Sequence, residues 1–287
     1  MRIVDHVSIT GTHLKDNIVM IPELNRNKPA TPQFIEMANL NVKLTRPTAF
    51  ICIDGTTVHQ SEAGLSKGID QYVVAIKGTS PYIAHQWAST FENIECLTSM
   101  EVVNGTCASA IQAIYRANQI LMDPIGDAEE VIILGHERIT PDTVRLFKEL
   151  RIDVTCGDGF VYMRVARGID ISKPVWKWAY NENPFVFTKD TINTLIPDYR
   201  IGYVKLHGTG TPCNNEAEAD LAALATPLMY KPTIGHTQGI SALLETCLIL
   251  DDPKIRGRIL VTANGLGGYY GAFTLTKPNA RTDSYPQ

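Results

Sequence analysis

Apolar and polar positions along the chain follow two periods, one typical of strands and one typical of helices. Short apolar, β-branched runs predict strands at Arg2–Ile9, Ala49–Ile53, Gln71–Ile76, Ile94–Val103, Glu130–Leu134, Phe160–Ala166, Ile201–Leu206, Ile259–Ala263 and Ala272–Thr276. Apolar residues three and four positions apart predict helices at Ile83–Phe91, from Cys107 onward, and at Asp142–Leu150, Glu216–Ala225 and Gly239–Leu250, with shorter ones near Phe34–Asn39 and Lys189–Leu195. The remainder of Asp170–Asp198 fits neither period and is predicted to be a surface excursion. The alternation predicts a mixed α/β fold.

A single thiol stands where one of these strands changes into a helix. The pair Asn104-Gly105 ends the strand, and apolar residues at helical spacing follow Cys107. A cysteine at a helix start faces unpartnered backbone N–H groups and the positive end of the helix dipole, and both favour the thiolate that attacks carbonyls. Cys107 is therefore a candidate nucleophile. The alternative is a packed core cysteine, because unpaired cysteines are among the most buried residues.

Composition narrows the classes of function. The chain has 287 residues, of which 44% are hydrophobic, and a formal net charge of −4. These values predict a globular protein with a full core, and they argue against a nucleic-acid binder, which needs a basic face. Six cysteines without CxxC spacing favour the reducing cytoplasm over a secreted disulfide scaffold. We also predict no membrane span, because no window approaches the roughly 18 apolar residues that a span requires.

Three later segments end an apolar run with glycines and a polar side chain. They are His207-Gly208-Thr209-Gly210-Thr211-Pro212, Lys231-Pro232-Thr233-Ile234-Gly235-His236 and Asn264-Gly265-Leu266-Gly267-Gly268. Glycines allow the backbone to approach a ligand closely. Taken singly, each histidine is more often structural than catalytic, and each glycine loop is more often a plain turn. Zinc ligation by Cys107, His207 and His236 stays an alternative that the spacing does not require.

The order TCASA, HGTGTP, KPTIGH and GLGG resembles the β-ketoacyl-acyl-carrier-protein synthases, or ketosynthases. These are condensing enzymes of fatty acid and polyketide synthesis in the thiolase superfamily. Cys107 matches the family's nucleophile, and His207 and His236 match its two histidines. Lys231 and Glu218 match its supporting lysine and acidic residue.

The resemblance extends to the glycine loop formed by Gly265, Leu266, Gly267 and Gly268. It implies that the backbone N–H groups of Cys107 and Leu266 hold the oxyanion of the acyl intermediate. Leu266 stands where the family commonly has a phenylalanine gate. The chain is also shorter than the usual catalytic domain of the family, so the loops that normally shape the acyl tunnel and the cap are expected to be missing or shortened.

The resemblance implies a layered αβαβα thiolase-like fold of two similar halves. We place these halves at about 1–168, with the nucleophile, and 169–287, with both histidines. The implied reaction is acyl transfer to Cys107 and then decarboxylative Claisen condensation with a malonyl thioester. A thiolate accepts an acyl group from a thioester readily, and two imidazoles can donate hydrogen bonds to the enolate that forms as CO₂ leaves.

The resemblance also implies partners. The substrates would be carried on the phosphopantetheine arm of an acyl carrier protein or on coenzyme A, and no cofactor or metal is expected. A homodimer, or a heterodimer with a second ketosynthase-like subunit, is expected to pair the strand Cys96–Val103 across a two-fold axis.

Two other functions stay open. An acyltransferase or thioester hydrolase would keep the acyl-cysteine step but pass the acyl group to an alcohol, an amine or water. A non-catalytic partner subunit, like the chain-length factors that pair with some ketosynthases, would need only the fold. The joint presence of Cys107, His207 and His236 argues against that role.

Overall fold

The computed structural model describes residues 1–53, 57–58, 76–77, 81–149, 152–178, 189–265 and 268–278. Its first large sheet has the strand order β1 (Arg2–Thr10), β10 (Gly159–Ala166), β8 (Glu130–Glu137), β4 (Thr48–Ile53) and β7 (Leu97–Val103). β4 is parallel to β7 and β8, whereas β10 is antiparallel to β8 and β1. The sheet is therefore mixed, with its parallel strands at one side.

The second large sheet repeats this arrangement with a later part of the chain. Its strand order is β11 (Ile171–Trp178), β15 (Tyr269–Lys277), β14 (Gly257–Gly265), β12 (Tyr203–Lys205) and β13 (Thr226–Leu228). β12 is parallel to β13 and β14, and β15 is antiparallel to β14 and β11. The two sheets thus have the same order and directions, which confirms the predicted fold of two pseudo-repeated halves. The domain boundary at residue 168, between β10 and β11, stays a prediction.

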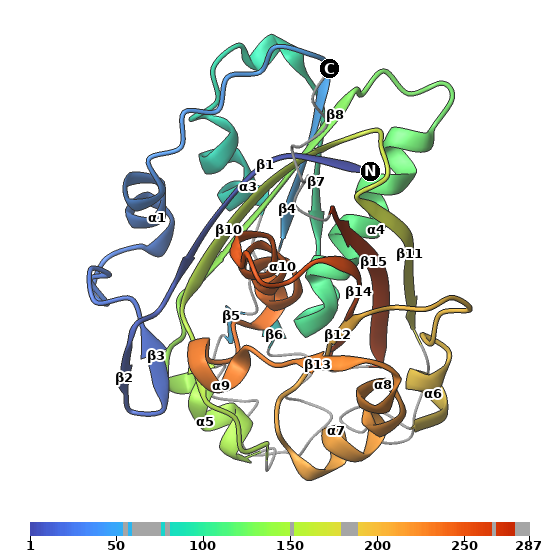
Figure 1. Ribbon diagram of the computed structural model, residues 1–287. Helices are drawn as coiled ribbons and strands as arrows, with labels where there is room; N and C mark the ends of the chain where they lie inside the picture. The colour runs from blue at the N-terminus through green and yellow to red at the C-terminus, as the bar shows by residue number, and fades with distance from the viewer. Residues whose placement is uncertain are drawn as a thin grey trace, which may run out of the picture.

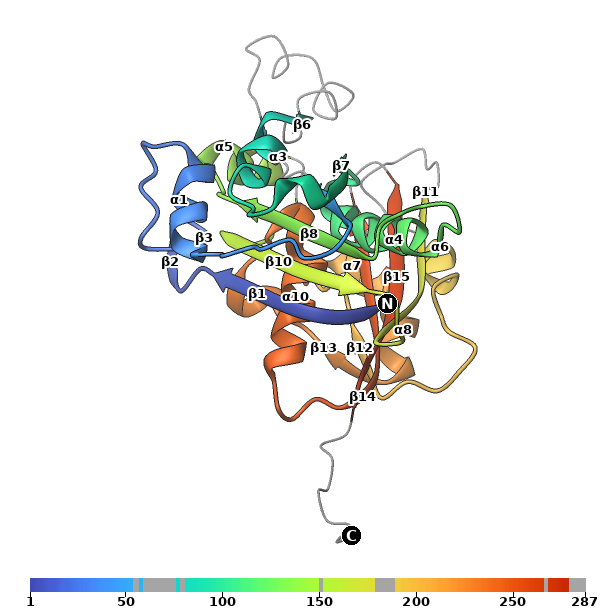
Figure 2. The same ribbon diagram turned by 90° about the horizontal axis from the view of Figure 1, so that it is seen from above.

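Helices form one layer between the two sheets and one layer outside each of them (Figures 1 and 2). In the central layer, α4 (Ser109–Met122) contacts β4, β8, β11 and β15, and α10 (Ser241–Asp251) contacts β1, β10 and β14. The outer layers contain α1 (Ala30–Ala38) and α3 (Pro81–Ala88) on the first sheet, and α6 (Lys189–Asn193), α7 (Pro212–Ala217) and α8 (Ala219–Leu224) on the second. The result is the expected αβαβα architecture.

The central strands are apolar on both faces because each face packs against helices. In β8, Val131 and Ile133 belong to the core around α4 and α10, whereas Ile132 and Leu134 belong to the core beneath α1 and α3. Strands buried on both faces form continuous apolar runs in the sequence. This is why the pattern located the central strands of both sheets.

The surface excursion predicted within Asp170–Asp198 is wrong over its first part, which forms the edge strand β11. A bulge between Ser172 and Val175 interrupts the alternation of this strand, and Lys173 has a φ of 49° there. Pro174 lies in the same bulge, and edge strands and bulges are the places where a sheet tolerates proline. The helix expected at Lys189 is present as α6.

The helix predicted at Glu216–Ala225 is instead two short helices, α7 and α8, which meet at Glu218. The Glu218 carboxylate accepts hydrogen bonds from the backbone N–H groups of His207 (2.7 Å) and Gly208 (3.0 Å). The Glu218 side chain therefore binds the preceding loop, at the single residue that separates the two helices.

Several small elements complete the described chain. They are β2 (His13–Lys15), β3 (Ile18–Met20), β5 (Thr57–Val58), β6 (Ile76–Lys77), α5 (Pro141–Glu149), β9 (Cys156–Gly157) and α9 (Lys231–Ile234). Of the strand predicted at Gln71–Ile76, only its last residue lies within the described residues, in β6. The sequence pattern predicted neither β13 nor α9, because both are too short to show a period.

Candidate active site

Cys107 lies in a tight 3₁₀ turn, Thr106–Ala108, that leads from β7 into α4. The turn is fixed by Ser109, whose hydroxyl accepts from Gly105 N–H (2.8 Å) and donates to the Thr106 carbonyl (2.6 Å). Thr106 has a φ of 51°, an uncommon conformation for a residue with a side chain. The predicted position of Cys107 at the entry to a helix is confirmed, and its side chain is buried.

The second half of the chain contains a matching turn, Gln238–Ile240, that leads into α10. Gln238 has a φ of 47°, and Ser241 follows it at the spacing that Ser109 has after Thr106. The two turns pack against each other, and Gln238 Oε1 lies 3.9 Å from the Cys107 sulfur. The pseudo-two-fold relation of the halves thus places Gln238 beside the candidate nucleophile.

His207 follows β12 at the carboxyl end of that strand, as predicted. Its backbone is held from two sides. Glu218 accepts its N–H, and the Lys231 ammonium donates to its carbonyl. Both supporting residues that the resemblance indicated therefore position the His207 loop and not its imidazole ring.

His236 is positioned by a close approach of two backbone segments. Gly235 has a φ of 75°, and a side chain on it would lie 2.3 Å from the Cys156 carbonyl oxygen, so only glycine fits. His236 Nδ1 lies 3.1 Å from the Ser241 hydroxyl oxygen. The His236 and His207 rings meet edge to face, with their centroids 5.3 Å apart.

Behind the two imidazoles lies a buried cluster of charged side chains. Glu245 pairs with Lys205 at 2.5 Å and with Lys231 at 2.9 Å, and all three side chains are at most 3% exposed. Burial lowers the pKa of Lys205 to about 8, although Glu245 opposes this shift. Glu245 is therefore the anion that compensates two buried lysines, one of which holds His207.

Glu245→Gln is expected to destabilise the protein by about 3–5 kcal/mol, because it leaves Lys205 and Lys231 with an uncompensated buried charge. Urea unfolding would measure the change in the free energy of unfolding. The control is Asp198→Ala, which removes an exposed ion pair with Lys173 and should cost less than about 1 kcal/mol. Equal stability of the two variants would contradict this role of Glu245.

Both imidazoles are held in the neutral form. Burial is the largest cause that lowers the pKa of His207 and of His236 well below 6.5, and the positive charge of Lys231 adds to it in both cases. A neutral imidazole carries one N–H, and His207 Nδ1 has no hydrogen-bond partner among the residues that the structure describes. The pair is thus suited to donate hydrogen bonds to a developing oxyanion.

These two histidines should make stability depend on pH. Below about pH 6.5 they bind protons in the unfolded chain but not in the folded protein, so the free energy of unfolding should fall as the pH falls from 6.5 towards 5. Urea unfolding across this range would measure the slope. The double variant His207→Gln/His236→Gln should reduce the slope by about two bound protons. A slope equal to that of the wild type would contradict the neutral state.

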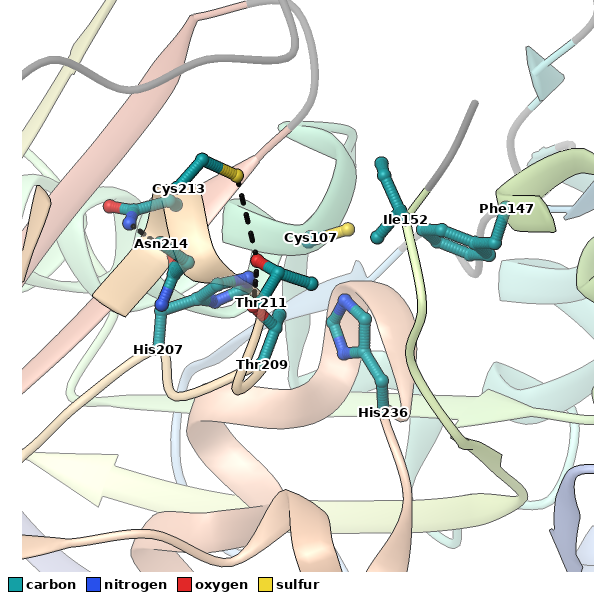
Figure 3. Close-up of a pocket in the computed structure, with 10 residues that line it drawn as sticks. Cys107, Phe147, Ile152, His207, Thr209, Thr211, Cys213, Asn214 and His236 are labelled. Carbon is teal, nitrogen blue, oxygen red and sulfur yellow. Dashed lines mark hydrogen bonds between the residues drawn. The ribbon is translucent and has the colours of Figure 1, made fainter. Parts of the chain in front are cut away.

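One pocket with an empty volume of about 490 Å³ brings these groups together (Figure 3). Its lining residues are Cys107, Phe147, Ile152, His207, Thr209, Thr211, Cys213, Asn214, His236 and Asn264. In Figure 3 the Cys107 sulfur and the His236 ring face a common space that the apolar side chains of Phe147 and Ile152 bound. The three residues predicted to be catalytic therefore share one pocket, although they come from both halves of the fold.

The glycine loop begins at Gly265, which lies against the turn that holds Cys107. A side chain on Gly265 would lie 2.2 Å from Thr106 Oγ1, so β14 must end in glycine to pass this turn. Gly268 has a φ of 85° and begins the return of the chain into β15. Leu266 and Gly267 lie outside the described residues, so the predicted gate and oxyanion roles stay predictions.

Neither a metal site nor a membrane-spanning helix is supported in the described part of the chain. No three His, Cys, Asp or Glu side chains there have the arrangement of a metal site, so the zinc alternative lacks a set of ligands. Among the same residues, no helix has the length and apolar content to cross a membrane.

Sequence reasoning missed four polar residues at or behind this pocket: Lys205, Asn214, Gln238 and Glu245. It named Asn264 only as the polar residue that opens the glycine loop. For Gln238, a weak signal was present, because Ser-Ala follows at the same distance after both turns. The others are isolated polar residues within apolar or helical stretches, and only the packing of the two halves shows what they contact.

Comparison with known proteins was made at the level of sequence and of structure. No family model matches the chain. A probable polyketide synthase of Dictyostelium discoideum is 35% identical over 77 residues, which cover 21% of this chain and 3% of that protein. The chain thus spans only a small part of the length of this curated relative.

Solved ketosynthase structures match most of the chain. The ishigamide ketosynthase/chain length factor matches with a TM-score of 0.62 and 12% identity, over 91% of this chain and 87% of that one. A β-ketoacyl synthase from Burkholderia phymatum gives 0.60 and 15%, over 86% and 80%. An oxazolomycin ketosynthase domain of Streptomyces albus gives 0.55 and 15%, over 85% and 76%.

These matches establish the fold. The chain has the thiolase-like fold of these ketosynthase structures, which confirms the fold that the resemblance implied.

Proposed function

We propose that the chain is a ketosynthase-like condensing enzyme that acylates Cys107 and then condenses the acyl group with a malonyl thioester. The observation that carries the proposal is the shared pocket, in which the Cys107 thiol and two neutral imidazoles meet. A packed core cysteine would not need two histidines from the other half of the chain at its pocket.

In the first step the Cys107 thiolate attacks the carbonyl carbon of an acyl thioester. The carbon–sulfur bond of the incoming thioester breaks, and the carrier thiol leaves with a proton. By the resemblance, the backbone N–H groups of Cys107 and Leu266 stabilise the tetrahedral oxyanion. The product is an acyl-cysteine thioester close in free energy to the substrate.

In the second step a malonyl thioester loses CO₂ and becomes an enolate, whose oxygen accepts hydrogen bonds from His207 and His236. The enolate carbon attacks the acyl-Cys107 carbonyl, the carbon–sulfur bond breaks, and Cys107 is released as a thiolate. Because both imidazoles are neutral N–H donors, the enolate is stabilised without a proton transfer that would end the reaction.

The test is product analysis by mass spectrometry after incubation with an acyl thioester and a ¹³C-labelled malonyl thioester. A 3-oxoacyl product two carbons longer, together with CO₂, is expected. Release of free acid or of an acylated alcohol or amine would indicate the hydrolase or acyltransferase alternative. Neither acylation nor product would indicate a chain-length-factor-like subunit. Using carrier-bound and coenzyme A thioesters in parallel would test the proposed acyl carrier protein.

We also propose a dimer, formed with a second copy or with a ketosynthase-like subunit. In the described part of the fold β7 is the edge of the first sheet, and Thr98 and Ser99 on it are exposed. A long edge strand with unpaired backbone groups favours pairing with another strand. Sedimentation at micromolar concentration is expected to show a dimer, which would bury roughly 2,000 Å² or more. A stable and active monomer would contradict this proposal.

A further inference from the structure

The pocket contains a buried hydrogen-bond acceptor that the proposed reaction does not use. Asn264, the next-to-last residue of β14, lines the pocket and is 1% exposed. Its Oδ1 atom is buried and has no hydrogen-bond partner in the described protein. Leaving a buried amide oxygen unpaired costs free energy, and native proteins seldom do so without a function.

The orientation of this amide follows from the residues behind it. The Glu218 carboxylate already accepts two backbone N–H groups, so it is an acceptor, and Asn214 must point its NH₂ group towards it. Asn214 Oδ1 then faces Asn264, whose Nδ2 lies 3.5 Å away and must be the donor of that pair. The relay from Glu218 through Asn214 therefore fixes Oδ1 as the free end of Asn264.

Asn264, the last residue of this hydrogen-bonded series, lines the same pocket as Cys107. Gly265, the neighbour of Asn264, touches the turn that holds Cys107. An acyl thioester bound at Cys107 would therefore occupy the pocket that Asn264 also lines. Phe147 and Ile152 give the same pocket apolar side chains.

We propose that Asn264 Oδ1 accepts a hydrogen bond from the bound substrate, so that the enzyme selects acyl thioesters carrying a hydroxyl or an amide N–H group near the thioester. This inference rests on the proposed function, because it concerns the same pocket. The donor has two sources. It is either a hydroxyl on the acyl chain or the amide N–H of the thiol arm that carries the chain.

Four small thioesters separate the two sources. They are the butyryl and 3-hydroxybutyryl thioesters of N-acetylcysteamine, which has an amide, and of methanethiol, which has none. The rate of Cys107 acylation, measured by intact-protein mass spectrometry, is compared between the wild type and Asn264→Leu, which keeps the approximate size but removes the acceptor. The matched control is Asn193→Leu, because Asn193 Oδ1 is also buried and unpartnered but belongs to α6, outside the pocket lining.

Asn264→Leu is expected to lower kcat/KM for donor-bearing thioesters by about tenfold, the effect of one lost hydrogen bond. If the donor is the acyl hydroxyl, the loss appears with both hydroxybutyryl thioesters and with neither butyryl one. If the donor is the amide of the arm, it appears with both N-acetylcysteamine thioesters and with neither methyl one. The proposal would be overturned if, with each of the four thioesters, Asn264→Leu lowered kcat/KM no more than Asn193→Leu does.

A binding measurement keeps this result separate from the proposed function. If the wild type transfers no acyl group to Cys107, the proposed function is wrong, and binding of unreactive thioether analogues of the four compounds then decides the inference. Saturation-transfer NMR should show weaker binding of the donor-bearing thioethers to Asn264→Leu than to Asn193→Leu. Equal binding to both variants would overturn the assignment of Asn264.

Discussion

Replacing Cys107 by alanine is expected to abolish acylation of the protein and to lower condensation by on the order of 10⁴-fold or more, as loss of a nucleophile does in other covalent enzymes. Cys107 lies in the turn that leads into α4, where the positive end of the helix dipole favours the thiolate, and it lines the pocket. Intact-protein and peptide mass spectrometry after incubation with an acyl thioester would locate the label.

Two other cysteines provide the comparison. Cys213 is exposed and lines the same pocket. The variant Cys213→Ala is expected to keep the label on Cys107, which would show that access alone does not decide reactivity. Burial, with Cys107 and Glu137 nearby, raises the pKa of Cys156 to about 12, so its thiolate is scarce at neutral pH. A label that persists in Cys107→Ala, or that sits on Cys213 or Cys156, would show that the nucleophile is misassigned.

The single variants His207→Ala and His236→Ala are expected to slow CO₂ release from a malonyl thioester by on the order of 10²-fold each, because each removes one donor to the enolate oxygen. Acylation of Cys107 should continue at nearly the wild-type rate, since the helix start activates the thiol without a proton acceptor in every step. Radiolabelled CO₂ release and acylation kinetics, measured separately, would resolve the two half-reactions.

His6→Ala is a suitable control, because His6 lies on β1 and pairs with Asp251, and it is not among the residues that line the pocket. It should leave both half-reactions unchanged. If both pocket variants released CO₂ at the wild-type rate, the condensing mechanism would be wrong, and a hydrolase or acyltransferase would be favoured. If both lost acylation as well, the histidines would be needed to activate Cys107.

The sequence by itself indicated the candidate catalytic residues and most of the fold. Strands such as β4 and β8 pack on both faces, so their apolar runs are continuous and visible without coordinates. The turns around Cys107, His207 and His236 are marked by glycines, which report a local backbone requirement. Such features show directly in the residue types along the chain, and a sequence pattern can therefore predict them.

Features of β11, α7 and α8 were decided by tertiary contacts. β11 carries a bulge with Lys173 and Pro174 and is stabilised as a strand by pairing with β15, a partner almost a hundred positions later in the chain. The helix predicted around Glu218 divides because its carboxylate binds the His207 loop. Local propensity depends on neighbouring residues and carries no information about a distant strand or loop. It therefore predicted neither the strand β11 nor the division of the helix.

The polar groups around the pocket are brought together only by tertiary contacts. The packing of two pseudo-equivalent turns brings Gln238 to the Cys107 sulfur, and the second sheet brings Lys205 to Glu245 and Asn264 to Asn214. The sequence therefore determined which candidate groups are present. The tertiary structure determined the neutral state of His207 and His236, through burial and the nearby lysines, and it left Asn264 Oδ1 without a partner among the described residues. Both effects arise only when distant segments exclude water together.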